Sequence, residues 1–544
     1  MNGNQAIAKI LKLEGVEWVS CFPSNPLIEA VANEGIRLDM FRTERGAIMA
    51  ADGYSRTSGR TKFGVTITQG GTGAENAMGG IAQAYADNIP ILLLPGGSPL
   101  ASRNVRPSFL VSDVYSPISK HAEPIMASGQ IGAVLRRAFH GMRNGSGGPM
   151  TVETPGDIAG AEVPNSVIEN YKPAKRTIVS PSLSDVKDAV KIFLAAKNPV
   201  IWVGGGVIFG GACAELKELA ELTGVPVYTT MQGKSAFPED HELSLGAGSG
   251  ATTLPASTWL RESDVLLGLG TSLTKTNYGQ AIPPGKTIIH NTENIDEINK
   301  DESVEVGLPG DVKVTIQMLL DEVKAAIGEG GRTTDAAARI AELRTKWMAD
   351  WTPLLTSDEN PLNHYRVIHE IDTNLDKANS VVTHDAGTPR DTIIPFYHAT
   401  KPGGYVGWGK TTHLGFGIPL MIGTKIANPD KFCLNFMGDA AFGHSSIDIE
   451  VSARIGAPIT TVVLNNAGMA TYPSGYEAAQ ERFGVTNMTG NYADMAEAMG
   501  ATGLIVKTPD EMGPALVEAQ KLNADGKTVL IDVNAGFESK RSRF

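Results

Sequence analysis

The chain reads FCLNFMGDAAFGHSSIDIEVSARIGAPITTVVLNNAGM from Phe432 to Met469, and this stretch decides the fold. Two apolar runs, Phe432–Met437 and Ile459–Leu464, predict buried strands, and a helix-like segment separates them. A strand, a crossover helix and a second strand make the two strands parallel, with their carboxyl ends at the same edge of the sheet. If these strands are neighbours, Asp439 and Asn466, which follow them, should lie side by side.

The helix between the two runs carries start and stop signals. Ser445 and Asp448 form an S-x-x-D start signal, and apolar residues recur every four positions up to Ile455. Gly456 stands where a C-terminal cap belongs. The sequence therefore predicts a helix in this segment that ends before Gly456, with a start signal at Ser445.

The pair Asp439 and Asn466 is a candidate metal site. One carboxylate and one carboxamide oxygen suit a hard divalent cation such as Mg²⁺, which takes its other ligands from water and phosphate. The amides at the start of the helix, near Ala440 and Ala441, could receive that phosphate. The alternative is that both residues are ordinary turn residues, because Gly-Asp and Asn-Asn are common turn dipeptides.

Together, the two dipeptides resemble the diphosphate-binding motif of thiamine diphosphate enzymes, which begins Gly-Asp-Gly and ends Asn-Asn about thirty residues later. The resemblance implies thiamine diphosphate and Mg²⁺ as cofactors. It also implies three metal ligands, namely Asp439, Asn466 and the backbone carbonyl of Gly468. Ala440 stands where the family most often has Gly. The sequence Gly-Asp-Ala-Ala-Phe-Gly resembles the corresponding motif of the acyl-CoA lyase and oxalyl-CoA decarboxylase branch. The cofactor-binding residues implied in this motif are Gly438, Asp439, Ala440, Ala441, Asn466, Gly468 and Met469.

Length and composition limit the class of protein. At 544 residues the chain is long enough for about three domains of roughly 150 residues. Its 42% apolar and 19% charged residues are typical of a soluble globular protein. The net charge of -12 argues against nucleic-acid binding and against an anionic membrane surface. Because the three cysteines lack metal-ligand spacing and no apolar stretch approaches ~20 residues, we expect a cytoplasmic protein without a membrane span.

Glu44 is the second key residue, and it opens a predicted helix that closes before Gly59. Its simplest explanation is a first-turn carboxylate favoured by the helix dipole. However, the segment TERGAIMAADGYSR, from Thr43 to Arg56, resembles the family's Glu-Gln-Gly-Ala through Asp-Gly-Tyr-Ala-Arg signature. The resemblance implies that Glu44 hydrogen-bonds a ring nitrogen of the aminopyrimidine and so activates the cofactor. That role needs a carboxyl group held out of water.

Two further candidate catalytic residues in the first third are Asn25 and His121. Each could also be a hydrogen-bonded structural residue. A glycine-rich turn at Gly71–Asn76 could cradle a phosphate. The resemblance assigns this turn instead to the family's Gly-Pro-Gly-x-x-Asn motif, which lets the backbone approach the active site and the partner subunit closely.

The segment Gly407–Gly417 resembles the family's loop before the diphosphate motif. The resemblance implies that Leu414 stands beneath the cofactor and bends it, and that the carbonyl of Thr412 accepts a hydrogen bond from its 4'-amino group. Taken alone, Leu414 would be an ordinary core residue. His413 would lie near the reacting carbon, where a neutral imidazole could move protons, although a lone His is more often structural.

A predicted strand at Ser380–His384 leads into small residues that could meet the terminal phosphate, and the cofactor-binding candidates there are Gly387 and Thr388.

The central part of the chain has an alternating α/β pattern and a triple glycine at 204–206. The glycines could bind a nucleotide or form a tight turn. In the family this domain holds FAD, an adenine nucleotide or nothing. Acetolactate synthases carry Arg-Phe-Asp-Asp-Arg where this chain has Thr271–Thr274, which argues against FAD.

The predicted fold is α/β, with three consecutive α/β domains whose parallel sheets are flanked by helices. We expect a pyrimidine-binding domain at 1–165, a central nucleotide-binding-like domain at 180–328 and a diphosphate-binding domain at 355–537. The basic tail at 538–544 is either a frayed, solvated end or a lid whose cations meet an anionic substrate. No internal repeat is evident.

The resemblance implies an enzyme of the acetolactate synthase, pyruvate oxidase and 2-hydroxyacyl-CoA lyase type. We expect a lyase or carboligase that acts next to a 2-oxo acid carbonyl. The alternatives are a 2-hydroxyacyl-CoA lyase or oxalyl-CoA decarboxylase-like enzyme acting on an acyl-CoA, a flavin-containing pyruvate oxidase-like enzyme, and a non-catalytic homologue. Because the family pairs the pyrimidine site of one chain with the diphosphate site of another, at least a homodimer is expected, and a homotetramer is the favoured assembly.

Overall fold

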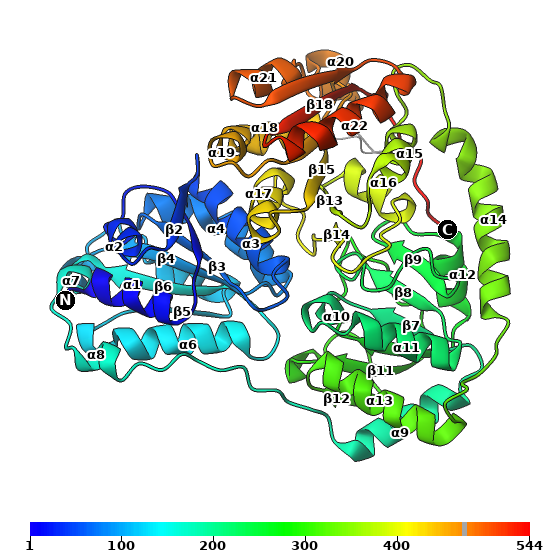
Figure 1. Cartoon of the computed structure of the whole chain (residues 1–544), viewed down its shortest axis with the longest axis horizontal. Coiled ribbons are helices and arrows are strands. Elements are labelled where there is room, and N and C mark those ends of the chain that lie inside the picture. Colours follow the sequence, from blue (N-terminus) through cyan, green and yellow to red (C-terminus); the bar gives the residue numbers. More distant parts are fainter. Residues whose placement is uncertain (470–475) are drawn as a thin grey trace. The chain divides into compact units, whose positions relative to one another are not determined.

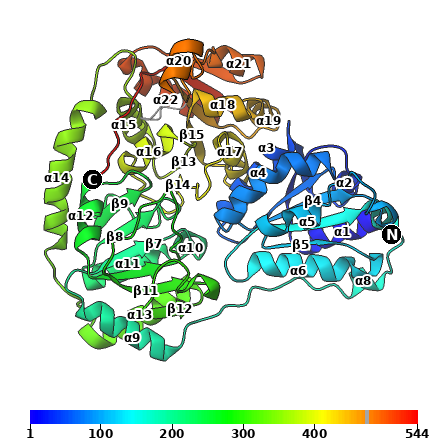
Figure 2. The same cartoon turned by 180° about the vertical axis from the view of Figure 1, so that it is seen from behind.

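The computed structural model describes residues 1–469 and 476–544, and these residues form three parallel six-stranded sheets. Helices flank each sheet (Figure 1), and Figure 2 shows the same elements from behind. The predicted fold class, three consecutive α/β domains, is confirmed. None of the helices in this described part is both long and apolar enough to cross a membrane.

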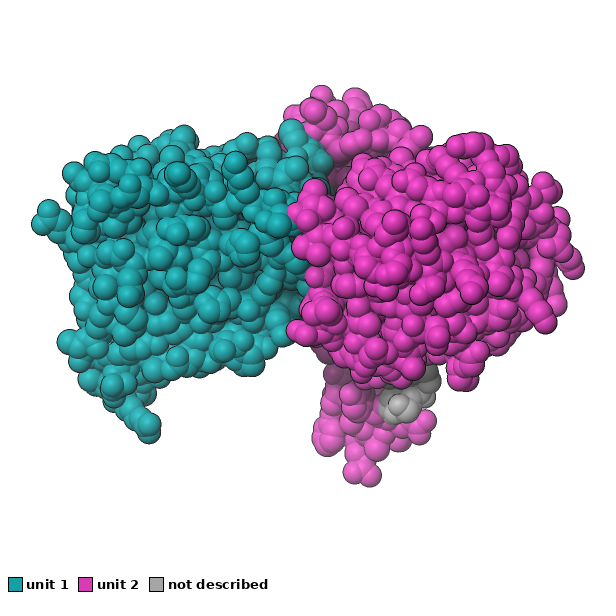
Figure 3. Space-filling view, turned by 90° about the horizontal axis from the view of Figure 1, so that it is seen from below, with its two compact units in different colours: residues 1–177, 418–429, 447–457 teal, residues 178–417, 430–446, 458–544 magenta. Residues whose placement is uncertain are grey.

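The chain divides into two compact units, which Figure 3 colours separately. Unit 1 contains residues 1–177, 418–429 and 447–457, and unit 2 contains residues 178–417, 430–446 and 458–544.

The first sheet belongs to unit 1. Its strands are β1 Trp18–Cys21, β2 Arg37–Met40, β3 Gly64–Thr68, β4 Ile91–Gly97, β5 His121–Pro124 and β6 Met150–Pro155. The helices along this part are α1 Gly3–Leu13, α2 Leu27–Asn33, α3 Glu44–Arg56, α4 Thr72–Ala86, α5 Val111–Tyr115, α6 Ile131–Arg143, α7 Gly156–Gly160 and α8 Ser166–Glu169. The strand order is β2-β1-β3-β4-β6-β5.

Alternation along β1 explains the layers of this sheet. Val19 and Cys21 pack into the apolar core with residues of α1, α2 and α6. The opposite face meets α3, where the Ser20 hydroxyl donates to the carbonyl oxygen of Ala47 at 2.8 Å. Trp18, on the same face as Ser20, lies 5.1 Å from Tyr54 between ring centroids.

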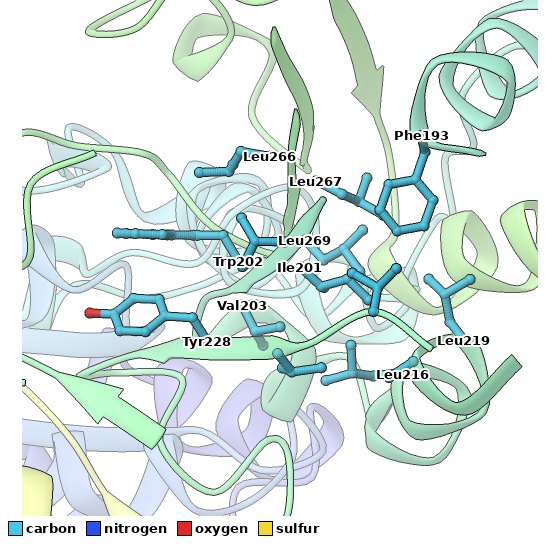
Figure 4. Close-up of a cluster of buried hydrophobic side chains, with 14 of the residues drawn as sticks. Phe193, Ile201, Trp202, Val203, Leu216, Leu219, Tyr228, Leu266, Leu267 and Leu269 are labelled. Carbon is cyan, nitrogen blue, oxygen red and sulfur yellow. The ribbon is translucent and has the colours of Figure 1, made fainter. Parts of the chain in front are cut away.

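The central sheet belongs to unit 2. Its strands are β7 Val200–Val203, β8 Val227–Thr230, β9 Ser244–Gly248, β10 Val265–Leu269, β11 Thr287–Thr292 and β12 Val306–Pro309. Its helices are α9 Leu183–Ala195, α10 Gly206–Phe209, α11 Cys213–Thr223, α12 Leu254–Glu262 and α13 Val312–Ile327. The order β12-β11-β10-β7-β8-β9 is that of dinucleotide-binding sheets. Figure 4 shows part of its core, in which the rings of Trp202 and Tyr228 lie 4.5 Å apart.

The triple glycine lies at the switch point between β7 and β10. The backbone N–H of Gly206 donates to the carbonyl oxygen of Gly270 at 2.9 Å. A side chain at Gly204 or Gly206 would overlap with the backbone around Gly270. The glycines are therefore needed for close packing of two chain segments, which favours the tight-turn explanation.

The third sheet belongs to unit 2. Its strands are β13 Ser380–His384, β14 Tyr405–Val406, β15 Phe432–Gly438, β16 Thr460–Asn465, β17 Thr502–Val506 and β18 Val529–Asn534. The helices of this part are α14 Ala336–Leu355, α15 His364–Asn374, α16 Thr388–Phe396, α17 Gly417–Ala427, α18 Asp439–Ser445, α19 Asp448–Arg454, α20 Glu477–Phe483, α21 Tyr492–Ala498 and α22 Pro509–Ala524. The order β14-β13-β15-β16-β18-β17 repeats that of the first sheet, so two thirds of the chain share a topology that no sequence repeat indicates.

Two helices of the last third, α17 and α19, belong to unit 1. A side chain at Gly53 of α3 would overlap with the carbonyl oxygen of Leu420, and one at Gly423 would overlap with that of Ala50. The backbones of α3 and α17 are therefore in direct contact, which only glycine permits at these two positions.

The predicted helix start at Ser445 is wrong. The first helix, α18, begins at Asp439, directly after β15, and a second, α19, begins at Asp448. The Ser445 hydroxyl is buried without a hydrogen-bond partner among the described residues, so it caps nothing. Gly456 has φ of 67°, as expected for the residue that ends a helix.

The tail is not frayed, which corrects the first of the two explanations above. Ser542 is 1% exposed, and its hydroxyl donates to the carbonyl oxygen of Thr252 at 2.6 Å. The same hydroxyl accepts the indole N–H of Trp347 at 2.9 Å. Tyr365 donates to the carbonyl oxygen of Lys540 at 2.6 Å. These contacts anchor the end of the chain to unit 2.

Candidate functional site

Glu44 begins α3 and is buried, with 7% of its surface exposed. The Thr43 hydroxyl caps the helix by accepting the N–H of Gly46 at 2.9 Å. The side-chain amide of Asn76 donates to Oε2 of Glu44 at 2.7 Å. A Cβ at Gly73 would lie 3.1 Å from Oε1, so this glycine leaves room for the carboxyl group. The turn Gly71–Asn76 therefore encloses Glu44 and holds it out of water.

Asn25 lies at the carboxyl ends of the first sheet's strands, whereas His121 lies at the amino end of an edge strand. Asn25 follows the carboxyl end of β1, as Glu44 follows that of β2, and its Nδ2 donates to the carbonyl oxygen of Thr68 at 2.9 Å. His121 opens the edge strand β5 and pairs with Met150, the first residue of β6. Its half-exposed ring contacts Glu123 at 3.2 Å. The sheet thus groups Asn25 with Glu44 and places His121 away from them.

Asp439 and Asn466 follow two neighbouring strands. β15 and β16 pair in parallel, with Gly438 opposite Leu464, so the predicted parallel direction is confirmed and the two strands are neighbours. Oδ1 of Asn466 accepts the N–H of Gly468 at 3.1 Å, which closes a tight turn. Met469 is largely exposed, and its N–H donates to the carbonyl oxygen of Thr486 at 2.7 Å.

The two oxygens of the Asp439 carboxylate differ. Oδ1 accepts the N–H of Ala440 at 2.8 Å. Oδ2 is buried and has no hydrogen-bond partner in the described part of the chain. Burial raises the pKa of Asp439, and the backbone amides of Ala440, Ala467 and Gly468 oppose this rise. Such a carboxylate needs an added partner, because an unsatisfied buried oxygen is costly.

Asp385 holds the loop that carries Leu414. Its fully buried carboxylate follows β13 and accepts the N–H of Gly415 at 3.0 Å and that of Gly417 at 2.8 Å. Oδ1 also accepts the N–H of Ala386 at 2.8 Å. Leu414 itself is 37% exposed, so it is not an ordinary core residue. A fixed backbone and an uncovered aliphatic side chain suit a residue that supports a ligand.

Thr412 and His413 lie in the same loop and are half-buried. The loop contacts the segment that follows β10 of the central sheet, because Nζ of Lys410 donates to the Ser272 hydroxyl at 2.8 Å. Ser272 belongs to the segment Thr271–Thr274, which follows β10. In this chain that segment therefore supports the Leu414 loop.

Gly387 and Thr388 open α16. Gly387 is the N-cap residue with φ of 84°, a backbone conformation that favours glycine. The neighbouring Pro389 lies 3.9 Å from where a Cβ on Gly438 would be. The start of α16 is therefore next to the start of α18, where Asp439 lies.

Sequence models of protein families match all three parts of the chain. The model described as thiamine pyrophosphate enzyme, N-terminal TPP binding domain, matches residues 1–122. The central domain of the same family matches residues 186–319, and its C-terminal TPP binding domain matches residues 385–533. The chain belongs to the thiamine pyrophosphate enzymes. Thiamine pyrophosphate is the cofactor also called thiamine diphosphate.

Relatives of this thiamine pyrophosphate enzyme are similar over nearly the whole chain. A probable acetolactate synthase large subunit of Methanocaldococcus jannaschii is 30% identical, covering 95% of this chain and 90% of the relative. That of Methanococcus aeolicus is 29% identical, covering 96% and 90%. The acetolactate synthase large subunit of Haemophilus influenzae is 26% identical, covering 98% and 94%.

For two residues of this thiamine pyrophosphate enzyme, Asn76 and Asp385, the sequence analysis predicted no individual role. Asn76 closes the Gly-x-Gly-x-x-Asn motif, so the motif itself was the signal for its contact with Glu44. Asp385 shows only as a carboxylate directly after a predicted strand. Its partners lie 30 and 32 positions further along the chain, and no local pattern indicates them.

Proposed function

We propose that this thiamine pyrophosphate enzyme is an acetolactate synthase-like carboligase, which makes or breaks carbon–carbon bonds next to the carbonyl of a 2-oxo acid. The relatives named acetolactate synthase, similar over nearly their full length, support this substrate class. The observation that carries the proposal is the buried, unpartnered Oδ2 of Asp439 beside the Asn466 turn, because it is the anchor that a metal-bound diphosphate requires.

Asp439 and Asn466 hold Mg²⁺ in this proposal, together with the backbone carbonyl of Gly468. Among the described residues no group of three or more His, Cys, Asp or Glu forms a metal site. The amide and backbone oxygens must therefore complete the set, as is usual for a cation that keeps its phosphate and water ligands. Gly438, Ala440 and Ala441 then face the diphosphate, while Gly387 and Thr388 face its terminal phosphate.

Glu44 holds the activating proton. When bound, thiamine diphosphate would supply carbon-nucleophile chemistry toward the substrate carbonyl. Glu44 shares its proton with a ring nitrogen of the aminopyrimidine, and Asn76 keeps the carboxyl group oriented for this exchange. Leu414 would support the cofactor, and the carbonyl oxygen of Thr412 would accept a hydrogen bond from its amino group. His413 and Asn25 are the candidates for moving protons at the substrate.

We further propose that two copies of the chain build each site, with Glu44 from one copy serving the diphosphate site of the other. Mixing a Glu44→Gln variant with an Asp439→Asn variant tests this arrangement. Each variant alone should be inactive. After subunit exchange, about a quarter of the wild-type activity should return, because half of the dimers are mixed and one of their two sites is intact. A mixture that stays inactive despite mass-spectrometric proof of mixed dimers would contradict shared sites.

A product screen tests the activity itself. The purified chain is incubated with thiamine diphosphate and Mg²⁺, and with either 2-oxo acids such as pyruvate or acyl-CoA and formyl-CoA with aldehydes and ketones. We expect turnover of 2-oxo acids that falls at least about 10²-fold in Glu44→Gln. The matched control is Glu29→Gln, an exposed first-turn carboxylate of α2.

Turnover confined to acyl-CoA substrates would favour the 2-hydroxyacyl-CoA lyase-like alternative suggested by Gly438–Gly443. No turnover in either group would refute both activities. An FAD or adenine nucleotide in the central domain stays a prediction, which the absorbance spectrum of the purified protein would test.

A further inference from the structure

The C-terminal segment, Glu538–Phe544, is bound along unit 2 by contacts at almost every residue. Besides the Ser542 and Lys540 contacts described above, Oε2 of Glu538 accepts the side-chain amide of Asn363 at 2.8 Å. The ammonium group of Lys540 lies 4.4 Å from the ring centroid of Trp351. The segment is therefore an integral part of the fold, and its arginines have defined positions.

Arg541 reaches the start of α16. Its Nη2 donates to Oγ1 of Thr388 at 2.7 Å, and its Nη1 donates to the carbonyl oxygens of Glu538 and Lys540, both at 2.9 Å. All of these acceptors are neutral, and no carboxylate of the described chain lies within ion-pair distance of this guanidinium. Its half-buried positive charge is therefore uncompensated.

Arg543 offers a direct comparison two residues later. Its side chain is 61% exposed and pairs with Asp391 at 3.4 Å, and its Nε donates to the carbonyl oxygen of Gly250 at 2.7 Å. Its charge already has a carboxylate partner. The two arginines belong to the same segment, and both contact residues of α16. Only Arg543 has a carboxylate partner there, so the charge of Arg541 is available to a ligand.

The charge balance at the diphosphate end of the proposed site, counted without the cofactor's own thiazolium cation, favours one more cation. A diphosphate ester carries roughly two to three negative charges near neutral pH, since its last ionisation resembles that of a phosphate monoester. Asp439 adds another negative charge, and one Mg²⁺ offsets only two. The chain has a net charge of -12, so background charge does not help. Thr388, which Arg541 contacts, precedes Pro389, and Pro389 lies against Gly438 beside Asp439.

We infer that Arg541 recognises the terminal phosphate of thiamine diphosphate, with Thr388 positioned by the same guanidinium. The C-terminal segment then lines the phosphate end of the site as a fixed part of the fold. This inference rests on the proposed cofactor site. It adds a residue that distinguishes thiamine diphosphate from unphosphorylated thiamine, and this residue lies outside the family motifs in this chain. Arginine suits this role because its planar donors can bind a phosphate and a hydroxyl at once.

The test measures cofactor binding to the full chain by isothermal titration calorimetry with saturating Mg²⁺. The Kd for thiamine diphosphate should rise about tenfold in Arg541→Gln, in line with the loss of one charge-assisted hydrogen bond. The Kd for unphosphorylated thiamine should stay within about twofold, since only the phosphate end is affected. Arg543→Gln is the matched control and should leave both constants unchanged.

Arg541→Lys keeps the charge but loses the planar donors that can bind a phosphate and the Thr388 hydroxyl at once, so its Kd for thiamine diphosphate should rise about threefold, less than in Arg541→Gln. If Arg541→Gln does not fold, this variant decides instead, because an unchanged Kd for thiamine diphosphate in folded Arg541→Lys contradicts the inference. Equal losses for thiamine diphosphate and thiamine, or equal effects of the Arg541 and Arg543 variants, also overturn it. Failure of the wild-type chain to bind thiamine diphosphate would instead refute the proposed cofactor site.

Discussion

Replacing Asp448 by Asn should stabilise the chain more at alkaline pH than at acidic pH. Asp448 is the first residue of α19 and is 2% exposed. Its Oδ2 lies 2.5 Å from where a Cβ on Gly46 of α3 would be, and its Oδ1 has no hydrogen-bond partner in the described residues. Burial raises the pKa of Asp448 to about 7, although the positive charge of Arg45 opposes the rise.

The sign and size of the effect follow from linkage. An unfolded Asp has a pKa of about 3.9, so between pH 4 and 7 the folded chain binds more protons than the unfolded chain. The stability contributed by this group is therefore lost as the pH rises toward 7. The three-unit difference in pKa corresponds to about 4 kcal/mol at full ionisation, of which about 3 kcal/mol is lost between pH 5 and 8.

The assay is urea unfolding of both proteins from pH 5 to pH 8, followed by hydrogen exchange at α3 and α19 to localise the effect. The free energy of unfolding of Asp448→Asn, relative to wild type, should increase by about 3 kcal/mol across this range. Asp188→Asn, an exposed carboxylate on α9, should show no pH-dependent difference. A difference for Asp448→Asn that stays constant within about 0.5 kcal/mol would refute a raised pKa.

Three other predictions concern the site and its support. Asp385→Asn weakens the acceptors of the Gly415 and Gly417 amides, each worth about 1.5–3 kcal/mol, so hydrogen exchange in residues 407–416 should accelerate; unchanged exchange would exclude this support. Gly423→Ala forces a methyl group onto the backbone of α3 and should cost about 1–3 kcal/mol in thermal unfolding, whereas Gly129→Ala, which meets nothing within 4 Å, should be neutral. Chelation of divalent metal should weaken thiamine diphosphate binding and added Mg²⁺ should restore it; binding that survives exhaustive chelation would argue against the metal site.

Local patterns were sufficient where a single element carries the information. The two apolar runs before Asp439 and Asn466 predicted two buried parallel strands, because buried parallel strands are apolar throughout. The spacing after Glu44 predicted α3, which the structure has at Glu44–Arg56. The helix start at Ser445 was misplaced because a start pattern cannot reveal that α18 begins directly at the end of β15.

Features that depend on distant partners could not be predicted. The C-terminal segment contains charged residues that are typical of a solvated end, yet Ser542 is buried by contacts with Thr252 and Trp347, far away along the chain. The common strand order of the first and third sheets is also invisible in the sequence, since a topology constrains the layout of strands and not the identity of their side chains.

That common order assigns corresponding positions to the residues of the site. The loop after the second strand carries Glu44 in the first sheet and Leu414 in the third. After the third and fourth strands, the third sheet places Asp439 and Asn466, whereas the first sheet has Gln69 and Ser98 there. An ancestral duplication would explain this layout, because the two sheets share one strand order while different polar residues follow their corresponding strands. Each of the two sheets would then contribute different residues to the proposed site.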